Sequence, residues 1–208
     1  MDLAEIRQTL IINQQQGTLV EVYNFNDDDM FDVGFVIAVD ELFVLLLGLD
    51  WDGKINGLTA IRLTSIHQVR DQTDYLLTVS TKAKVAQEHG YFDIWHLQDY
   101  LHDHSFKQVN ILRTLLEEAY QNHQAVVLGT DQYKGMDDFQ GFVTDLSTIN
   151  LTLHYYNSHD LSSLWEYDIL VAKVDYLRVH GYQAAQTTAI FEQVFHEGGT
   201  SWIPAGNN

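Results

Sequence analysis

The sequence predicts a mainly β protein with helices, an α+β fold built from two five-stranded, bent antiparallel barrels. Three observations predict this fold: a long internal repeat, short apolar strands separated by turn residues within each repeat, and helical periodicity outside them. Residues 17–70 recur in diverged form at residues 124–178, where Gly141-Phe142-Val143 repeats Gly34-Phe35-Val36. Further on, Ile61, Ile66, Val69 and Arg70 recur as Ile169, Val174, Leu177 and Arg178. The repeat indicates two copies of one structural unit.

The first unit, residues 1–75, begins with a short helix over residues 2–14, with Asp2 as its N-cap. Five strands follow, separated by an acidic turn at residues 26–29 and by the turn dipeptides Asp52-Gly53 and Asn56-Gly57. We expect these strands at residues 19–22, 31–39 (bent at Gly34), 43–49, 58–63 and 66–69. Five short strands with tight turns favour a closed barrel, which has no exposed sheet edge.

The second unit, residues 105–181, is expected to repeat this plan behind a helical linker at residues 76–104. Residues 106–122 place Val109, Leu112, Leu115, Leu116 and Ala119 on one helical face. The strands are expected at residues 126–128, 140–146, 149–156, 169–172 and 174–179. Residues 182–208 form a C-terminal helix, expected over 187–196 with Gly198 as its cap, and a tail that contains Trp202-Ile203-Pro204.

Composition and charge exclude several classes of function. The 208 residues are 46% hydrophobic, and 29 acidic residues against 11 basic ones give a net charge of −18. This charge disfavours nucleic acids and anionic membranes, which are bound mainly through Lys and Arg. The absence of cysteine excludes disulfides and thiolate chemistry. The acidic start of the chain does not resemble a secretion signal, and the longest aliphatic run, residues 42–47, is too short to span a bilayer, so we expect a cytoplasmic protein.

The repeated residues resemble the two sequence motifs of the Sm-like proteins, which are five-stranded bent barrels with an N-terminal helix. The first motif is similar to Val33-Gly34-Phe35-Val36, Val39-Asp40 and Phe43-Val44-Leu45, and in the later copy to Gly141-Phe142-Val143, Asp145 and Ile149-Asn150-Leu151. The second motif is similar to Ile61-Arg62-Leu63-Thr64-Ser65-Ile66, and in the later copy to residues 169–174. The resemblance covers about half of the chain, and its nearest match is an uncharacterised bacterial branch with two such units.

This resemblance implies a possible nucleic-acid pocket at Phe43, Arg62, Ile149 and Asn150. In RNA-binding Sm proteins an Asn and an Arg-Gly pair hold a base, and the residue before the Asn stacks on it. Here the first copy keeps Arg62 but has Val44 in place of Asn and Leu63 in place of Gly. The second copy keeps Asn150 but has Leu170 in place of Arg, so neither copy holds the whole pocket.

Other motifs favour structural interpretations. Asp50-Trp51-Asp52-Gly53 begins like a calcium loop, but the twelfth position is Ile61 instead of Glu, which favours a hairpin turn. His96, Asp99, His102 and Asp103 contain metal-binding side chains, as does the neighbouring His104, but a solvated helix end explains them. Most aromatic residues are expected in the core, while Trp51 and Trp165, next to turns, are candidate exposed anchors. No motif assembles a nucleophile, a base and an orienting group, so we assign no catalytic, cofactor-binding or metal-binding residue.

The leading hypothesis is a non-catalytic interaction or scaffold protein that binds by strand addition or self-association, as a dimer or a ring. The resemblance implies pairing of a fourth strand with a fifth, within one chain or between chains, and the candidate edge strands end at Leu63, Val69, Ala172 and Val179. The acidic surface favours a basic or neutral protein partner. We expect no cofactor, because the sequence contains no cofactor-binding motif. Two alternatives stay open: RNA binding through the degenerate pocket, and a metal-dependent enzyme using the His96–Asp103 cluster.

Overall fold

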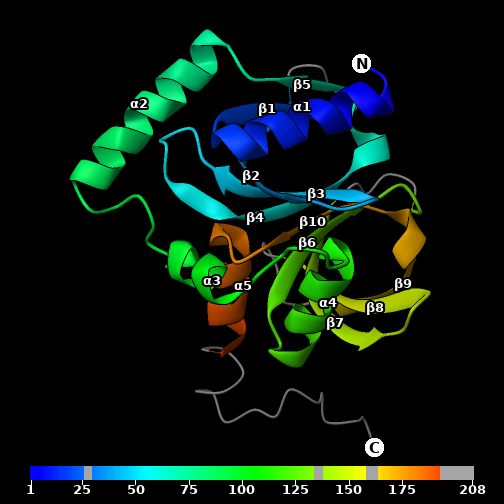
Figure 1. The fold of residues 1–208 in the computed structure, drawn as a ribbon. Helices are drawn as coiled ribbons and strands as arrows, with labels where there is room; N and C mark the ends of the chain where they lie inside the picture. Colours follow the sequence, from blue (N-terminus) through cyan, green and yellow to red (C-terminus); the bar gives the residue numbers. More distant parts are fainter. Residues whose placement is uncertain (26–29, 134–137, 158–163, 193–208) are drawn as a thin grey trace, which may run out of the picture.

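The fold is α+β, with helices packed against a single ten-stranded antiparallel sheet (Figure 1). The computed structural model describes residues 1–25, 30–133, 138–157 and 164–192. The expected acidic turn at 26–29, the end of the last helix beyond Glu192, its cap at Gly198 and the tail with Trp202-Ile203-Pro204 all lie outside these residues.

The sheet runs through both halves of the chain in the order β5-β1-β2-β3-β4-β10-β6-β7-β8-β9. The strands of the first half are β1 (Leu19–Tyr23), β2 (Asp32–Val39), β3 (Phe43–Leu49), β4 (Ile55–Arg62) and β5 (Gln68–Arg70). Those of the second half are β6 (Ala125–Thr130), β7 (Asp138–Leu146), β8 (Asn150–Tyr156), β9 (Leu164–Leu170) and β10 (Val174–Val179). Counted within its own half, each set has the order fifth, first, second, third, fourth. The two halves therefore share one topology.

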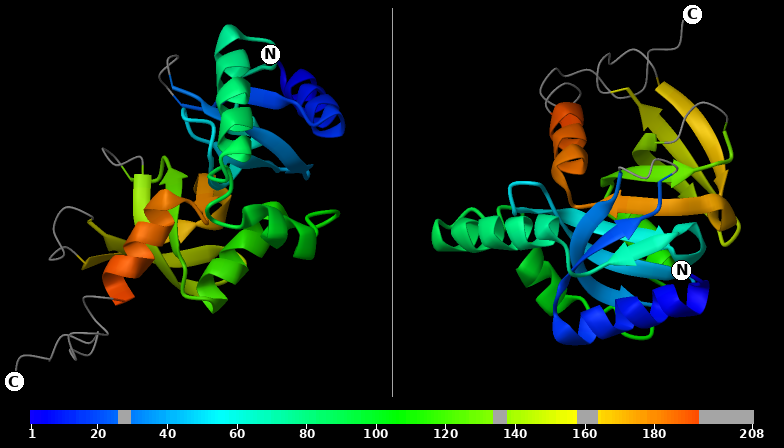
Figure 2. Two further views of the ribbon diagram at one scale, coloured as in Figure 1. Left: turned by 90° about the vertical axis from the view of Figure 1, so that its left-hand side faces the viewer. Right: turned by 90° about the horizontal axis from the view of Figure 1, so that it is seen from above.

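The two separate closed barrels expected from the sequence are not confirmed, because the sheet does not close. In the described residues β4 pairs with β10 of the other half, and β4 does not pair with β5. One large group of buried residues also extends from Leu45 and Leu58 in the first half to Val126 and Leu177 in the second. Figure 2 shows the halves as two lobes that meet where these strands pair.

The helices cover the sheet and connect its halves. They are α1 (Leu3–Gln16), α2 (Asp74–Glu88), α3 (Leu97–Asp103), α4 (Ile111–Gln121) and α5 (Tyr182–Phe191). The helices that precede the two halves have the same place, since α1 packs on β2 and α4 packs on β7. Asp2 forms the expected N-cap of α1, with a full capping box to Glu5, and Gly17 ends the helix in the left-handed conformation. The expected linker helix is instead two helices, α2 and α3, and α2 begins earlier than expected, at Asp74.

Gly34 and Gly141 occupy matching positions where two strands come unusually close. A Cβ at Gly34 would lie 2.5 Å from the carbonyl oxygen of Leu47 on β3, and one at Gly141 would overlap the carbonyl oxygen of His154 on β8. The bend expected at Gly34 corresponds to a register shift slightly later, between Val36 and Ala38, and the second half has a matching shift between Val143 and Asp145. The repeated Gly-Phe-Val therefore marks a close approach between the second and third strands of each half.

The turns between the second and third strands define how the halves align. The Asp40 carboxylate accepts hydrogen bonds from the backbone N–H groups of Leu42 and Phe43, both at 2.7 Å. In the second half the Ser147 hydroxyl accepts from the N–H groups of Ile149 and Asn150, at 3.2 and 2.8 Å. Asn150 therefore occupies the place of Phe43. The motif alignment that matched Val44 with Asn150 and Asp40 with Asp145 is wrong, because the turn polar group in the second half is Ser147.

Candidate functional site: the strand junction and the outer edge of β9

The junction between the halves is an antiparallel pairing of β4 with β10, a fourth strand against a fifth. The paired residues run from Ile61 with Tyr176 to Leu58 with Val179. Because β10 also pairs with β6, both of its sides are occupied. Two of the four candidate edges, the strands ending near Leu63 and Val179, are thus joined to each other. The candidate that ends at Ala172, expected over 169–172, is β9 at residues 164–170, followed by a 3-10 turn at 171–173.

Arg62, at the end of β4, stabilises the junction through hydrogen bonds of its guanidinium. Its Nε donates to the carbonyl oxygen of Val174 at 2.7 Å, and one terminal nitrogen donates to that of Val171 at 3.2 Å. The guanidinium also lies over the ring of Phe43, 4.7 Å from its centroid. Burial lowers the pKa of Arg62, and the nearby Asp175 carboxylate opposes this shift. Asp175 in turn accepts a hydrogen bond from the Ser65 hydroxyl at 2.9 Å.

Two residues of the suggested nucleic-acid pocket, Arg62 and Phe43, take part in these junction contacts. Phe43 is only 2% exposed, beneath Arg62, so its ring offers no face to a base. Ile149 and Asn150 lie in the other half, where the Ile149 carbonyl accepts from the N–H of Val171 at 2.8 Å. The 3-10 turn at Val171 thus separates Arg62 from Ile149 and Asn150.

The outer edge of the sheet in the second half is β9, which pairs with β8 on one side. No strand of the described residues pairs with its other side. Alternation along the strand turns the backbone groups of Glu166, Asp168 and Leu170 outward. By register these three residues match Leu58, Ala60 and Arg62 of β4, whose outward side pairs with β10. The β9 edge is therefore the counterpart of a strand that accepts another strand within the same molecule.

One part of the β9 edge is occupied by the side chain of Gln132. Its amide nitrogen donates to the carbonyl oxygen of Asp168 at 2.8 Å, and its amide oxygen accepts from the N–H of Leu170 at 2.9 Å. The Tyr133 hydroxyl also donates to the Asp168 carbonyl, at 2.7 Å. A primary amide that donates and accepts in this way imitates a peptide group of an added strand. Gln132 therefore protects one end of the edge and leaves the part around Glu166 uncovered by it.

The surroundings of the uncovered part are acidic and aromatic. Glu166 pairs with His154 at 2.5 Å, and Asp168 accepts from the Thr152 hydroxyl at 2.8 Å, both across the strand pair. Trp165 is 64% exposed, as expected for a candidate anchor. Next to it on β9, Tyr167 packs edge-on against Tyr155, Phe139 and Tyr133. Such an edge presents carboxylates on one face and aromatic surface on the other.

The opposite outer edge is β5, which is short and partly occupied. It has three residues, Gln68–Arg70, paired with β1. The N-terminal amino group of Met1 lies 3.4 Å from the carbonyl oxygen of His67 just before it. Arg70 has the place of Arg178 in the second half and lies over the ring of Tyr23, 5.0 Å from its centroid. A strand added here would find few backbone groups.

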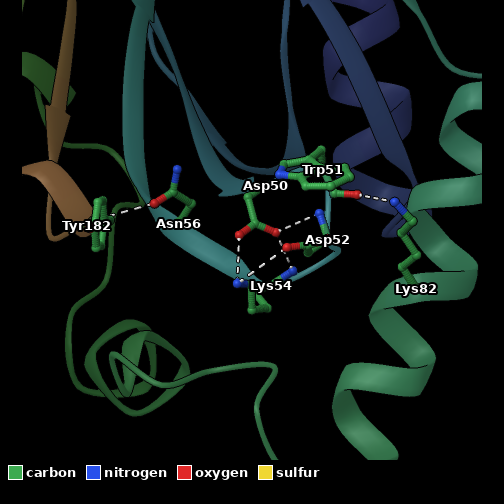
Figure 3. Close-up of polar contacts among 7 residues, drawn as sticks. All are labelled: Asp50, Trp51, Asp52, Lys54, Asn56, Lys82 and Tyr182. Carbon is green, nitrogen blue, oxygen red and sulfur yellow. Dashed lines mark hydrogen bonds and ion pairs between the residues drawn. The ribbon is translucent and has the colours of Figure 1, made fainter.

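The Asp50–Lys54 segment is the tight turn between β3 and β4, as the hairpin interpretation predicted (Figure 3). One Asp50 carboxylate oxygen accepts from the N–H groups of Asp52 and Lys54, and the Lys54 ammonium pairs with both carboxylates, at 3.4 and 3.7 Å. Trp51 is 68% exposed, and Lys82 of α2 donates to its carbonyl oxygen at 2.8 Å. The carboxylates of this turn thus already have a cation, Lys54.

The histidine-rich segment lies at α3. His96 precedes the helix with a positive φ of 55°, and its side chain and that of Asp99 are both largely exposed, 3.8 Å apart. His104 stacks on Tyr100. The described residues hold no group of three or more His, Asp or Glu side chains placed for a metal ion. Nor does the described part of the chain contain a helix long and apolar enough to cross a membrane.

Sequence reasoning missed Gln132 and Tyr133, because an amide and a phenol in a turn carry no signal of an edge contact. The pairing of Asp32 with Arg178 is also not predicted from the sequence, because the repeat identifies Arg178 only as the counterpart of Arg70. No protein-family model, curated protein or solved structure matches this chain. A function is therefore proposed from the contacts described above.

Proposed function

We propose that this chain is a non-catalytic interaction protein with two Sm-like units, and that the outer edge of β9 receives an extended segment of a partner protein. The observation that supports this is the β4–β10 pairing. In this pairing β4, the counterpart of β9, accepts the antiparallel strand β10 along the backbone groups that correspond to the outward groups of β9. Strand addition of this kind derives affinity from main-chain hydrogen bonds and specificity from alternate side chains.

The chemistry of the edge favours a partner segment in which basic and apolar residues alternate. Glu166 and Asp168 project from one face of β9, while Trp165 and Tyr167 project from the other. Opposite charges across a strand pair are favourable, and exposed aromatics are frequent anchors at interfaces. The net charge of −18 further favours encounter with a basic segment.

A second copy of the chain is a poorer occupant than a foreign segment. If β5 of a second copy repeated the β10 register on β9, Asp71 would lie opposite Glu166, and like charges at such positions repel. The added strand would also lack hydrogen bonds like those that Arg62 makes at the β4–β10 junction, because β9 has Leu170 at the position of Arg62. We therefore place self-association behind a partner protein, and RNA binding behind both, because Phe43 is covered.

The test uses a synthetic peptide with the sequence of residues 172–181, which contains β10, and a second peptide with the change Asp175→Lys. Binding to the whole protein is followed by NMR through the backbone amides of Trp165, Glu166 and Tyr167. We expect saturable shifts at these amides, with the lysine peptide binding more tightly. The Gln132→Ala protein should bind several-fold more tightly than wild type, because the side-chain amide no longer competes for Asp168 and Leu170.

The matched controls are two substitutions at one position. Glu166→Pro removes an outward N–H and should abolish binding, whereas Glu166→Ala keeps the N–H and should retain most of it. Melting curves establish that both variants are folded. Absence of any shift at β9, even in Gln132→Ala, would rule the edge out as an acceptor.

A further inference from the structure

A cleft of about 400 Å³ lies between the two halves, beside the β4–β10 junction and away from the β9 edge. Its walls include Asp32 of β2, Thr59 of β4, Arg178 of β10 and the first turn of α5, Tyr182 to Ala184. This volume is in the usual range for small-molecule sites, which often lie where two structural units meet. The strand-addition function makes no use of this cleft.

Asp32 of the cleft wall has a carboxylate that is only partly satisfied. Its Oδ1 accepts from a terminal nitrogen of Arg178 at 3.3 Å. Although 18% of the side chain is accessible, Oδ2 is shielded from solvent and has no hydrogen-bond partner among the described residues. Burial raises the pKa of Asp32, Arg178 lowers it, and Asp138 raises it further. A carboxylate that is held largely away from water with one oxygen unsatisfied is costly, and positive charge brought to its accessible part by a ligand would lower this cost.

Positive charge faces the same space from two other elements. The Arg178 guanidinium is held over the rings of Tyr176 and Phe25, 4.7 and 5.6 Å from their centroids, and remains partly accessible. Helix α5 begins at the cleft wall with Gly181 as its N-cap, so no cap side chain accepts from its first turn. Asn56 accepts from the N–H of Tyr182 at 3.3 Å. The next two residues, Gln183 and Ala184, also line the cleft at this partly positive helix end.

We propose that the cleft binds a small zwitterion of the α-amino acid class. Its ammonium group lies against the partly accessible side chain of Asp32, and its carboxylate lies toward Arg178 and the first turn of α5. A simple anion would meet the Asp32 carboxylate, and a simple cation would meet Arg178 and the helix end. A molecule with both charges, close together, matches the acceptor and the positive groups at once.

The test titrates the whole protein with glycine, L-alanine, L-serine and L-glutamine, and separately with methylammonium chloride and sodium acetate. Binding is read from the NMR shifts of the backbone amides of Thr59, Gln183 and Ala184. We expect at least one amino acid to give saturable shifts, with each single-charge probe binding at least about ten-fold more weakly. Acetate binding as tightly as the amino acids would reduce the cleft to an anion site, and no saturable shift with any amino acid would overturn the proposal.

Two substitutions sharpen the test. Asp32→Asn should weaken amino-acid binding at least about ten-fold, because the ammonium loses its ionic acceptor. Asp145→Asn, at an exposed position of β7, has the same change of charge and should bind as wild type does. If both variants lost binding equally, the effect would belong to net charge and the site assignment would be wrong. Should Asp32→Asn fail to fold, the comparison of probes on the wild-type protein still decides.

Discussion

At the scale of single residues, Arg62 illustrates how a side chain is used differently from what its motif implies. The resemblance to Sm-like proteins places an Arg at this position in a base-binding pocket. In this chain the guanidinium bonds two backbone carbonyls of the other half and covers Phe43. The contacts join groups more than a hundred positions apart, which a motif read along the sequence does not reveal.

We expect Arg62→Ala to lower the free energy of unfolding by about 2–4 kcal/mol, because it leaves two carbonyl oxygens without a donor and removes the contact with Phe43. Arg62→Lys should lose about half as much, since an ammonium cannot reproduce the planar contacts. Urea denaturation measures both. The control is Arg70→Ala. Arg70 is exposed and is the first-half counterpart of Arg178, so its substitution should change stability by less than about 1 kcal/mol. Equal effects of the Arg62 and Arg70 substitutions would contradict the assigned role.

At the scale of elements, Glu118 connects three of them. It lies on α4, accepts from the Tyr100 hydroxyl of α3 at 2.5 Å, and lies 3.3 Å from His180, which follows β10. Burial by itself would raise the pKa of Glu118, but the hydrogen bonds from His180 and Tyr100 prevail and lower it. Burial raises the pKa of Tyr100, and the hydrogen bond to Glu118 raises it further.

A folded-state pKa below the unfolded one means that ionised Glu118 stabilises the fold above the ordinary value of 4.5, and that this contribution is lost as the pH falls through the folded-state pKa. We expect Glu118→Gln to be less stable than wild type by about 1–2 kcal/mol at pH 7, with the difference shrinking at acidic pH. Thermal melts from pH 7 to below pH 4 measure it. Glu117→Gln, the neighbouring site, is the control. A difference independent of pH would show that the carboxylate charge is not involved.

Individual elements were predicted well where local chemistry determines them. The bounds of β3 and β10 match the expected strands, because each is a short apolar segment between clear turns. The prediction was poorer for α5 and β9, which begin at Tyr182 and Leu164, each five residues before the expected start, and for α2, which ends at Glu88 where one linker helix was expected to continue. Neither glycine nor proline marks the start of α2. The start of β9 follows residues 158–163, which lie outside the described residues.

At the scale of the whole molecule, the internal repeat predicted the shared strand order but not the joining of the halves into one sheet. The joining depends on which strands of the two halves pair with each other. This pairing is determined by contacts between the halves, such as the hydrogen bond from Arg62 to Val174 and the packing of Tyr176 among the buried residues of the first half. The candidate site depended on the same contacts. Trp165 was a candidate from its place near a turn, whereas Gln132 could only be found in three dimensions.

Because the sheet and the main buried cluster run through both halves, we expect one cooperative unfolding transition. Hydrogen exchange during urea unfolding should show the amides of β3 and β8 losing protection at the same denaturant concentration. Two separated transitions would show that the halves are independent units, in spite of the shared sheet.

Tyr176 of β10 lies with Ile6, Val36 and Ile61 in the second buried cluster. A residue of the second half therefore completes the buried core of the first half. On the ribosome, the first five strands emerge several seconds before this tyrosine, at the usual pace of translation. During that interval the nascent chain exposes the outward side of β4 and an apolar gap. The interior of the first half is therefore completed only after Tyr176 has been synthesised, and until then its exposed apolar surface favours binding by chaperones.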